Sequence, residues 1–375
     1  MPSRYAQWMY DWETRLTSVD NNRVVRPMDW GLDWTKSWPV RNGAPPSGKS
    51  GQTSRDLLHY FSRFNDRIIG DSDNFYSYQK PTDFRLERRE VQVFSTREVP
   101  DPRLEEKIRG THADFLRFTS PVVTPFPENN LLNARWFPAK GNRAVVLLPH
   151  WNADAIAYNS LCRALNWIGI AVLRMTMPYH DIRRPAEIDR ADYAVSANIG
   201  RTLDSVRQGV VDVRCCLDWL ETQGYSQLGI LGTSLGSCYA FIATAHDPRI
   251  TVAAFNHAST YFADVVWHGQ STRHIREGLE TAIDLQNLRQ VWRAVSPMSY
   301  FDKFSRWPRR SLIIYAKYDM TFLPEFSEQV VEEFEKHKLD HKVVVLPCGH
   351  YTLGETPYKY MDGWQLLNFL RTAFA

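Results

Sequence analysis

The chain has 375 residues, of which 43% are hydrophobic and 23% are charged. This composition excludes a disordered, collagen-like or coiled-coil protein, and the length is sufficient for one large α/β domain with an extension. The formal net charge is only +3, from 45 basic and 42 acidic residues. Because nucleic-acid grooves are strongly and locally basic, we expect no nucleic-acid partner.

The sequence also limits the cellular setting. No stretch approaches the roughly 18 apolar residues of a membrane span, and the N-terminal segment lacks the apolar core of a signal peptide. The cysteines show neither metal-ligand nor disulfide-scaffold spacing; they are Cys162, Cys215, Cys216, Cys238 and Cys348. We therefore expect a cytoplasmic protein with no membrane span and with reduced thiols.

Residues 1–115 are predicted to form an accessory region, because helical stretches such as 55–69 alternate with connections rich in Pro, Gly and Ser. Five tryptophans lie near its start: Trp8, Trp12, Trp30, Trp34 and Trp38. Side chains of this size are expected to be buried. The region is expected to clasp the rest of the chain, to cover a pocket or to form a homo-oligomer contact, and the sequence does not choose among these roles.

Residues 43–50, GAPPSGKS, match the phosphate-loop pattern G-x-x-x-x-G-K-[ST]. A working phosphate loop follows a buried strand and presents consecutive backbone N–H groups. Residues 33–42 do not read as such a strand, and Pro45 and Pro46 remove two donors. We interpret the segment as a polar surface loop, with nucleotide binding through Lys49 as the alternative.

From about residue 115 onward, short aliphatic runs alternate with helical segments, which is typical of a mostly parallel sheet flanked by helices. This alternation predicts an α/β domain over residues 116–375. Eight strands are predicted, at 115–119, 131–137, 144–149, 170–177, 227–231, 250–256, 311–316 and 342–347. Helices are predicted at 155–167, 199–223, 235–246, 326–337 and 359–373.

The connection between the strands at 250–256 and 311–316 is several times longer than a usual βα loop. This length predicts a helical cap inserted at about 261–308. Its tryptophans, Trp267, Trp292 and Trp307, are expected either to roof a pocket or to pack the cap helices together.

The motif Gly232-Thr233-Ser234-Leu235-Gly236 lies between a predicted strand and a predicted helix. A nucleophile elbow requires this strand, turn and helix order. Side chains at the two glycine positions would collide with neighbouring elements when the serine enters a strained turn. The motif predicts that Ser234 Oγ is presented at the carboxyl edge of the sheet, and an ordinary helix cap is the alternative.

A nucleophilic serine needs an imidazole to accept its proton and a carboxylate to orient that imidazole. Asp319 follows the strand at 311–316, and His350 follows the last strand, so both come after Ser234 in the order Ser, acid, His. We predict that they are the acid and the base, and that Gly349 lets the histidine loop turn sharply. We rank the other acids and histidines below these two residues. The alternative acids are Asp264, Asp302 and Glu325, and the alternative histidines are His257 and His341.

Negative charge that develops on a substrate carbonyl must meet preorganised hydrogen-bond donors. The backbone N–H of Leu235 is predicted to be one donor, because it follows the nucleophile. The second is expected in the loop after the strand at 144–149, where Asn152 is the first choice and Trp151 the second.

On these motifs, residues from about 115 to 375 resemble an α/β-hydrolase of the esterase and dienelactone-hydrolase type. Residues 178–185, PYHDIRRP, are similar to a Pro-Tyr-Tyr-Gly-x-Arg-Lys-Pro stretch of a poorly characterised group of α/β-hydrolase-domain proteins. Asp181 departs from the glycine of that stretch. Because this loop ends near the nucleophile in that fold, Tyr179, His180 and Arg183 are predicted to contact substrate, with ordinary salt bridges as the alternative.

The predicted function is that of a serine hydrolase, which cleaves a carboxylic ester of a small-molecule substrate through an acyl-enzyme on Ser234. This carboxylesterase-like chemistry needs no metal and no cofactor. Thioesterase and peptidase activities are the alternatives among enzymes. A catalytically silent binding protein of the same fold is the alternative outside them.

Overall fold

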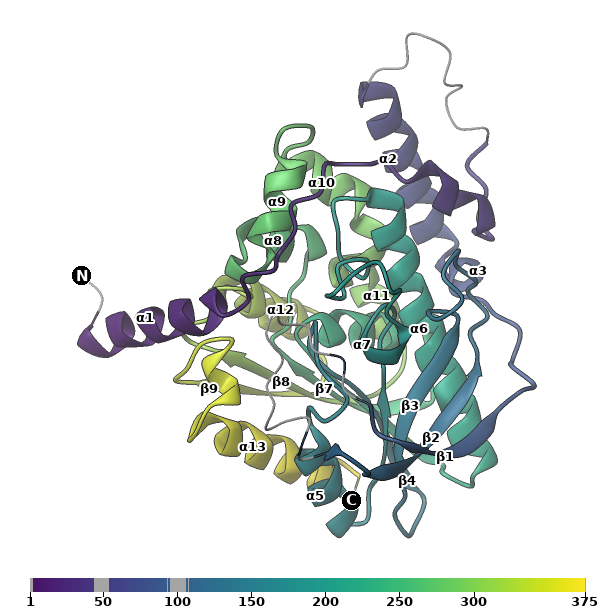
Figure 1. The fold of residues 1–375 in the computed structure, drawn as a ribbon, viewed down its shortest axis with the longest axis vertical. Coiled ribbons are helices and arrows are strands. Elements are labelled where there is room, and N and C mark those ends of the chain that lie inside the picture. The colour runs from purple at the N-terminus through teal and green to yellow at the C-terminus, as the bar shows by residue number, and fades with distance from the viewer. Residues whose placement is uncertain (1–2, 44–53, 93, 95–105, 107, 375) are drawn as a thin grey trace.

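The computed structural model describes residues 3–43, 54–92, 94, 106 and 108–374. Its centre is a nine-stranded sheet in the order β1-β2-β3-β5-β4-β6-β7-β8-β9 (Figure 1). Strands β5, β4, β6, β7, β8 and β9 pair in parallel, whereas β1, β2 and β3 pair antiparallel. The strands are β1 (Arg85–Glu90), β2 (His112–Thr119), β3 (Leu131–Phe137), β4 (Arg143–Leu148), β5 (Ala171–Met175), β6 (Gln227–Thr233), β7 (Ile250–Asn256), β8 (Arg310–Ala316) and β9 (His341–Leu346).

The eight predicted strands are confirmed, but the sheet has a ninth, β1. This strand lies within residues 1–115, the region predicted to be accessory. Its sequence, RLERRE, is largely exposed and charged. Charged side chains protect an edge strand from pairing with other chains. They also remove the alternation of polar and apolar residues by which a strand is recognised in a sequence.

Two hydrophobic cores cover the two faces of the sheet. In β4, Val146 and Leu148 enter one core, while Val145 and Leu147 enter the other. Because successive side chains of a strand point to opposite faces, a strand buried on both sides needs a continuous aliphatic run. The first core includes side chains of α6 (Ile199–Thr222), α7 (Leu235–His246) and α12 (Pro324–Lys336), and the second includes those of α5 (Asn159–Trp167) and α13 (Tyr358–Ala373).

The predicted cap is present between β7 and β8. It contains α8 (Phe262–His268), α9 (Arg273–Leu279), α10 (Leu285–Val291) and α11 (Phe301–Phe304) (Figure 1). Trp292 is fully buried and meets the ring of Phe262 edge-on. Trp307 is partly exposed. The tryptophans of the cap therefore pack its helices or face solvent, and they do not line the main cavity.

The N-terminal region contains α1 (Arg4–Ser18), α2 (Ser54–Gly70) and α3 (Ser72–Phe75). Helix α1 lies beside the end of β9, and α2 packs against the cap (Figure 1). Asn65 of α2 makes this second contact, because its side chain donates to the backbone oxygen of Val291 over 2.8 Å. Trp38 is fully buried and donates to Asp204.

The expected burial of the N-terminal tryptophans is only partly right. Trp12, Trp30 and Trp34 are half-buried, but Trp8 is 45% exposed. Its ring contacts those of Tyr5 and Trp12, with centroids 5.6 and 5.1 Å away.

Most of the phosphate-loop match, residues 44–50, lies outside the described residues. All five cysteines are buried and free. No helix in the described part of the chain is long and apolar enough to cross a membrane.

Candidate active site

Ser234 stands in the turn between β6 and α7 with φ 56° and ψ −121°. A non-glycine residue with positive φ is strained and must be held by its surroundings. A Cβ on Gly232 would lie 2.3 Å from the backbone oxygen of Gly236, and a Cβ on Gly236 would lie 2.5 Å from that of Leu148. The steric reason predicted for both glycines is therefore confirmed.

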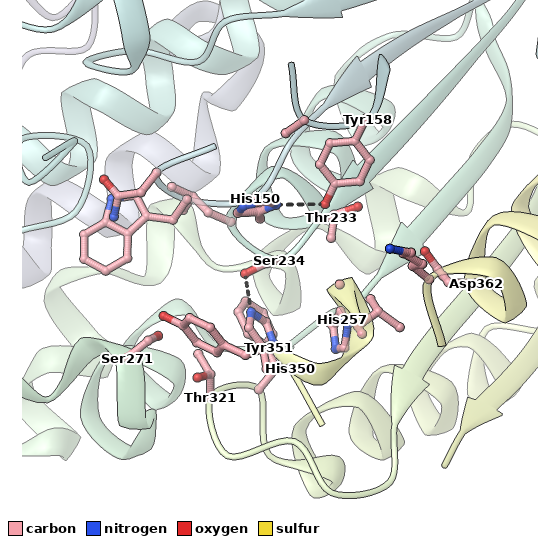
Figure 2. Close-up of a pocket in the computed structure, with 18 of the residues that line it drawn as sticks. His150, Tyr158, Thr233, Ser234, His257, Ser271, Thr321, His350, Tyr351 and Asp362 are labelled. Atoms are coloured by element: carbon pink, nitrogen blue, oxygen red, sulfur yellow. Dashed lines mark hydrogen bonds between the residues drawn. The ribbon is translucent and has the colours of Figure 1, made fainter. Parts of the chain in front are cut away.

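The structure brings the three predicted side chains into one hydrogen-bonded line. Ser234 Oγ lies 3.0 Å from His350 Nε2 (Figure 2), and His350 Nδ1 lies 2.9 Å from Asp319 Oδ2. The other oxygen of Asp319 accepts the backbone N–H groups of Thr321 and Phe322, each over 2.7 Å. Asp319 does not cap α12, because the cap position of that helix is Leu323.

The charges in this line favour a proton acceptor at His350. Burial opposes the charged imidazolium, but the carboxylate of Asp319, and after it that of Glu13, raise the pKa of His350 above its ordinary value. Burial alone would raise the pKa of Asp319. The charge of His350, its hydrogen bond to Asp319 and the nearby His257 lower it well below its usual range, so Asp319 stays ionised.

His257 also belongs to the site, although the sequence analysis ranked it below His350. It follows β7 directly with φ 55°, and its Nδ1 lies 2.7 Å from Asp319 Oδ2. Burial lowers the pKa of His257, so its imidazole is neutral. The sequence could have indicated His257 by its position one residue beyond a parallel strand, because such residues gather at the carboxyl edge of the sheet.

His257, Asp319 and His350 also offer one metal-ligand atom each, all within 4.8 Å of one another. Tetrahedral ligands about 2.1 Å from a metal ion are about 3.4 Å from one another. Here the two Nδ1 atoms lie 2.7 and 2.9 Å from the same carboxylate oxygen. These separations are shorter than those expected between ligands of a shared ion.

A cavity of about 1150 Å³ opens at Ser234 and His350. On the cap side it is lined by Phe262, Val265 and Val266 of α8. Trp151 forms another part of the wall. Its ring stacks with that of His274 at 5.8 Å, and the guanidinium of Arg190 lies 5.6 Å from its ring centre.

The predicted oxyanion donors all lie at this cavity. Leu235 is the first residue of α7, so its N–H has no acceptor within the helix. Trp151 and Asn152 also line the cavity. Asn152 has φ 60°, and its side-chain oxygen accepts the N–H of Ala191, which fixes this loop.

A polar wall lies on the side of Ser234 away from His350 (Figure 2). There His150 Nδ1 lies 3.0 Å from the Tyr158 hydroxyl, and Thr233 Oγ1 is buried. Burial lowers the pKa of His150 to about 4 and raises that of Asp362 to about 7. Close to neutral pH His150 is therefore uncharged, whereas Asp362 is about half ionised.

The predicted substrate contacts of Tyr179, His180 and Arg183 are wrong. All three are buried, and none lines the cavity. Arg183 is fully buried and forms an ion pair of 2.8 Å with Asp212 of α6. Burial lowers the pKa of His180 to about 3, so it is a neutral core histidine. The loop turns into the protein because Arg183 has a buried partner there.

Comparisons with solved structures agree with this architecture. Acetyl xylan esterase 1 from Thermoanaerobacterium sp. JW/SL YS485 superposes with a TM-score of 0.56 at 14% identity, over 93% of this chain and 100% of that chain. The acetyl xylan esterase from Paenibacillus sp. R4 gives a TM-score of 0.54 at 14% identity, over 95% and 98%.

A third similar structure is the acylaminoacyl peptidase of Pyrococcus horikoshii, with a TM-score of 0.55 at 11% identity, over 78% of this chain and 48% of that chain. No protein-family model and no curated protein sequence matches the chain. These identities are low, so the likeness is one of fold. The chain has the fold of the α/β-hydrolase superfamily.

Proposed function

We propose that the protein is a serine hydrolase that cleaves a carboxylic ester. The observation that supports this proposal best is the line from Ser234 through His350 to Asp319 at the wall of a large cavity. A serine in a strained turn, an imidazole at 3.0 Å and an ionised carboxylate behind it are the parts that nucleophilic acyl transfer needs.

In the proposed reaction, Ser234 Oγ attacks the ester carbonyl carbon while its proton passes to His350 Nε2. Asp319 holds the Nδ1 proton of His350 and stabilises the imidazolium. The carbonyl oxygen becomes an oxyanion, which receives hydrogen bonds from the N–H of Leu235 and from that of Asn152 or Trp151. When the oxyanion collapses, the alcohol leaves with the proton from His350.

The second half of the reaction removes the acyl group. Water enters the cavity, loses a proton to His350 Nε2 and attacks the acyl carbon on Ser234. Collapse of the second oxyanion breaks the bond to Ser234 Oγ, which regains its proton from His350. The products are a carboxylic acid and the free enzyme.

An ester is the preferred substrate class, because ester cleavage requires no specialised donor for the leaving group. The similar structures include proteins named as esterases and one named as a peptidase. They support a hydrolase but do not indicate whether it cleaves an ester or a peptide bond. Thioester and peptide cleavage are therefore the competing activities within the proposal.

Turnover of p-nitrophenyl esters from acetate to octanoate tests the proposal and reports the acyl length that the cavity accepts. We expect wild type to release p-nitrophenol, Ser234→Ala to lose this activity, and Ser305→Ala, at an exposed serine, to keep it. Equal turnover by Ser234→Ala would contradict the proposal. Failure of the folded wild type to turn over ester, thioester or peptide substrates would favour a silent binding protein.

A further inference from the structure

Helix α1 carries a buried carboxylate that contacts the loop of His350. Glu13 is only 1% exposed. Its Oε2 accepts the backbone N–H of Tyr351 over 3.0 Å, and its Oε1 accepts that of Thr352 over 2.6 Å. These two N–H groups belong to the residues directly after His350. The carboxylate therefore holds the backbone next to the proposed base.

The loop is shaped to admit this carboxylate. A Cβ on Gly349 would lie 2.4 Å from both Cγ and Cδ of Glu13. Gly349 does not have positive φ, so the sharp turn expected from the sequence is not its role. Glycine is needed here because Glu13 occupies the space of a side chain. The glycine before the proposed base and the carboxylate on α1 are thus complementary.

Further contacts join α1 to the same loop. Thr352 Oγ1 accepts the N–H of Gly349 over 2.7 Å and donates to Met9 Sδ over 3.3 Å. Tyr5 donates to the backbone oxygen of Pro347, which follows β9. Residues from three turns of α1 therefore contact the segment from Pro347 to Thr352, on both sides of His350.

Removal of the Glu13 carboxylate would leave the part-buried N–H of Tyr351 and the buried N–H of Thr352 without their acceptor. Buried amides that lose a partner destabilise the arrangement that buries them. A short loop that loses both bonds gains freedom to move. His350 would then spend less time in line with Ser234 and Asp319.

We propose that Glu13 is a positioning residue for His350, and that α1 is therefore a working part of the catalytic unit. This inference rests on the proposed function of Ser234. It assigns a role to a helix whose sequence carries no catalytic motif. The acidic groups that act on His350 are Asp319 and Glu13, and the neutral imidazoles near it are His257 and His150.

The test measures the rate at which a fluorophosphonate labels the full-length protein, in wild type, Glu13→Ala, Glu13→Gln and Asp11→Ala. Asp11 is the matched control, because it lies on the same helix and is exposed. A misplacement of a catalytic group by about 1 Å can lower a rate by about a hundredfold. We expect Glu13→Ala to be labelled about 10-fold to 100-fold more slowly, Glu13→Gln to be intermediate, and Asp11→Ala to match wild type.

The pH dependence of labelling separates positioning from a general loss of structure. Burial raises the pKa of Glu13, and where its carboxylate is ionised its negative charge raises the pKa of His350. Both Glu13 variants should therefore shift the acid limb of the labelling rate to lower pH, whereas a smaller folded fraction would reduce the amplitude without moving the limb. Circular dichroism reports the folded fraction. If Glu13→Ala does not fold, Glu13→Gln carries the test.

The outcomes distinguish this inference from the proposal on which it rests. Folded wild type that is never labelled would overturn the proposed function, and the inference with it. Labelling of wild type together with equal rates and equal acid limbs in the Glu13 variants would overturn the inference alone. Slower labelling with a shifted limb in both variants, and an unchanged Asp11→Ala, supports it.

Discussion

Nδ1 of His257 lies 2.7 Å from Oδ2 of Asp319, the same oxygen that lies 2.9 Å from Nδ1 of His350. Asp319 is fully enclosed, because its second oxygen accepts two backbone N–H groups. These contacts to both oxygens restrain the carboxylate that orients His350. His257 is therefore expected to contribute to catalysis through Asp319.

Substitution of His257 tests this contribution. His257→Ala removes one contact to an ionised group, a loss of about 1.4 kcal/mol that corresponds to about tenfold in rate. We expect kcat/KM for a chromogenic ester to fall by about tenfold in His257→Ala and by less in His257→Gln, which keeps an N–H donor. Unchanged kcat/KM in the alanine variant of a folded protein would show that His257 only fills space.

The pH profile of kcat/KM should follow the proton on His350. The base works only when neutral, and Asp319 and Glu13 raise its pKa above the ordinary value of 6.5. Activity should therefore rise with pH, with a midpoint above 6.5. Asp319→Asn should move the midpoint to lower pH and lower kcat by about 10⁴, the scale known for this substitution in other triads. A wild-type midpoint below 6.5 would contradict the assignment.

The complementarity of Gly349 and Glu13 predicts coupled stabilities. Gly349→Ala places a methyl group 2.4 Å from Glu13 Cδ, so we expect urea unfolding to show a loss of about 1–3 kcal/mol. In the Glu13→Ala background the same change should cost much less, because the space is free. A double-mutant cycle measures the difference. Equal costs in the two backgrounds would mean that the two residues do not compete for this space.

The buried pair of Arg183 and Asp212 should act on stability and not on substrate binding. Loss of one partner leaves an uncompensated charge, which costs about 3–5 kcal/mol. We expect Arg183→Ala to lower the free energy of unfolding by that amount, and any folded fraction to keep the wild-type KM. Lys36→Ala is the control, because its pair with Asp33 is 74% and 89% exposed. If Arg183→Ala raised KM without changing stability, the prediction that Arg183 contacts substrate would be supported instead.

The sequence predicts much of the fold because the central strands are buried on both faces, which forces continuous aliphatic runs such as that of β4. It also places Ser234, Asp319 and His350, because each lies just beyond a parallel strand. Strand β1 is not predicted, because its charged edge sequence lacks the alternation of polar and apolar residues that indicates a strand.

The sequence cannot predict contacts that depend on the folded surroundings. Glu13 and Tyr351 are 338 residues apart, and no local pattern connects them. The direction of the loop at 178–185 depends on the ion pair of Arg183 with Asp212 of α6. The sequence of the loop does not indicate this partner.

The most direct test of the central claim is mass spectrometry of the full-length protein after reaction with a fluorophosphonate. The account predicts one adduct, mapped to the peptide that contains Ser234, and none in Ser234→Ala. An unmodified but folded wild-type protein, or an adduct that persists in Ser234→Ala, would contradict it.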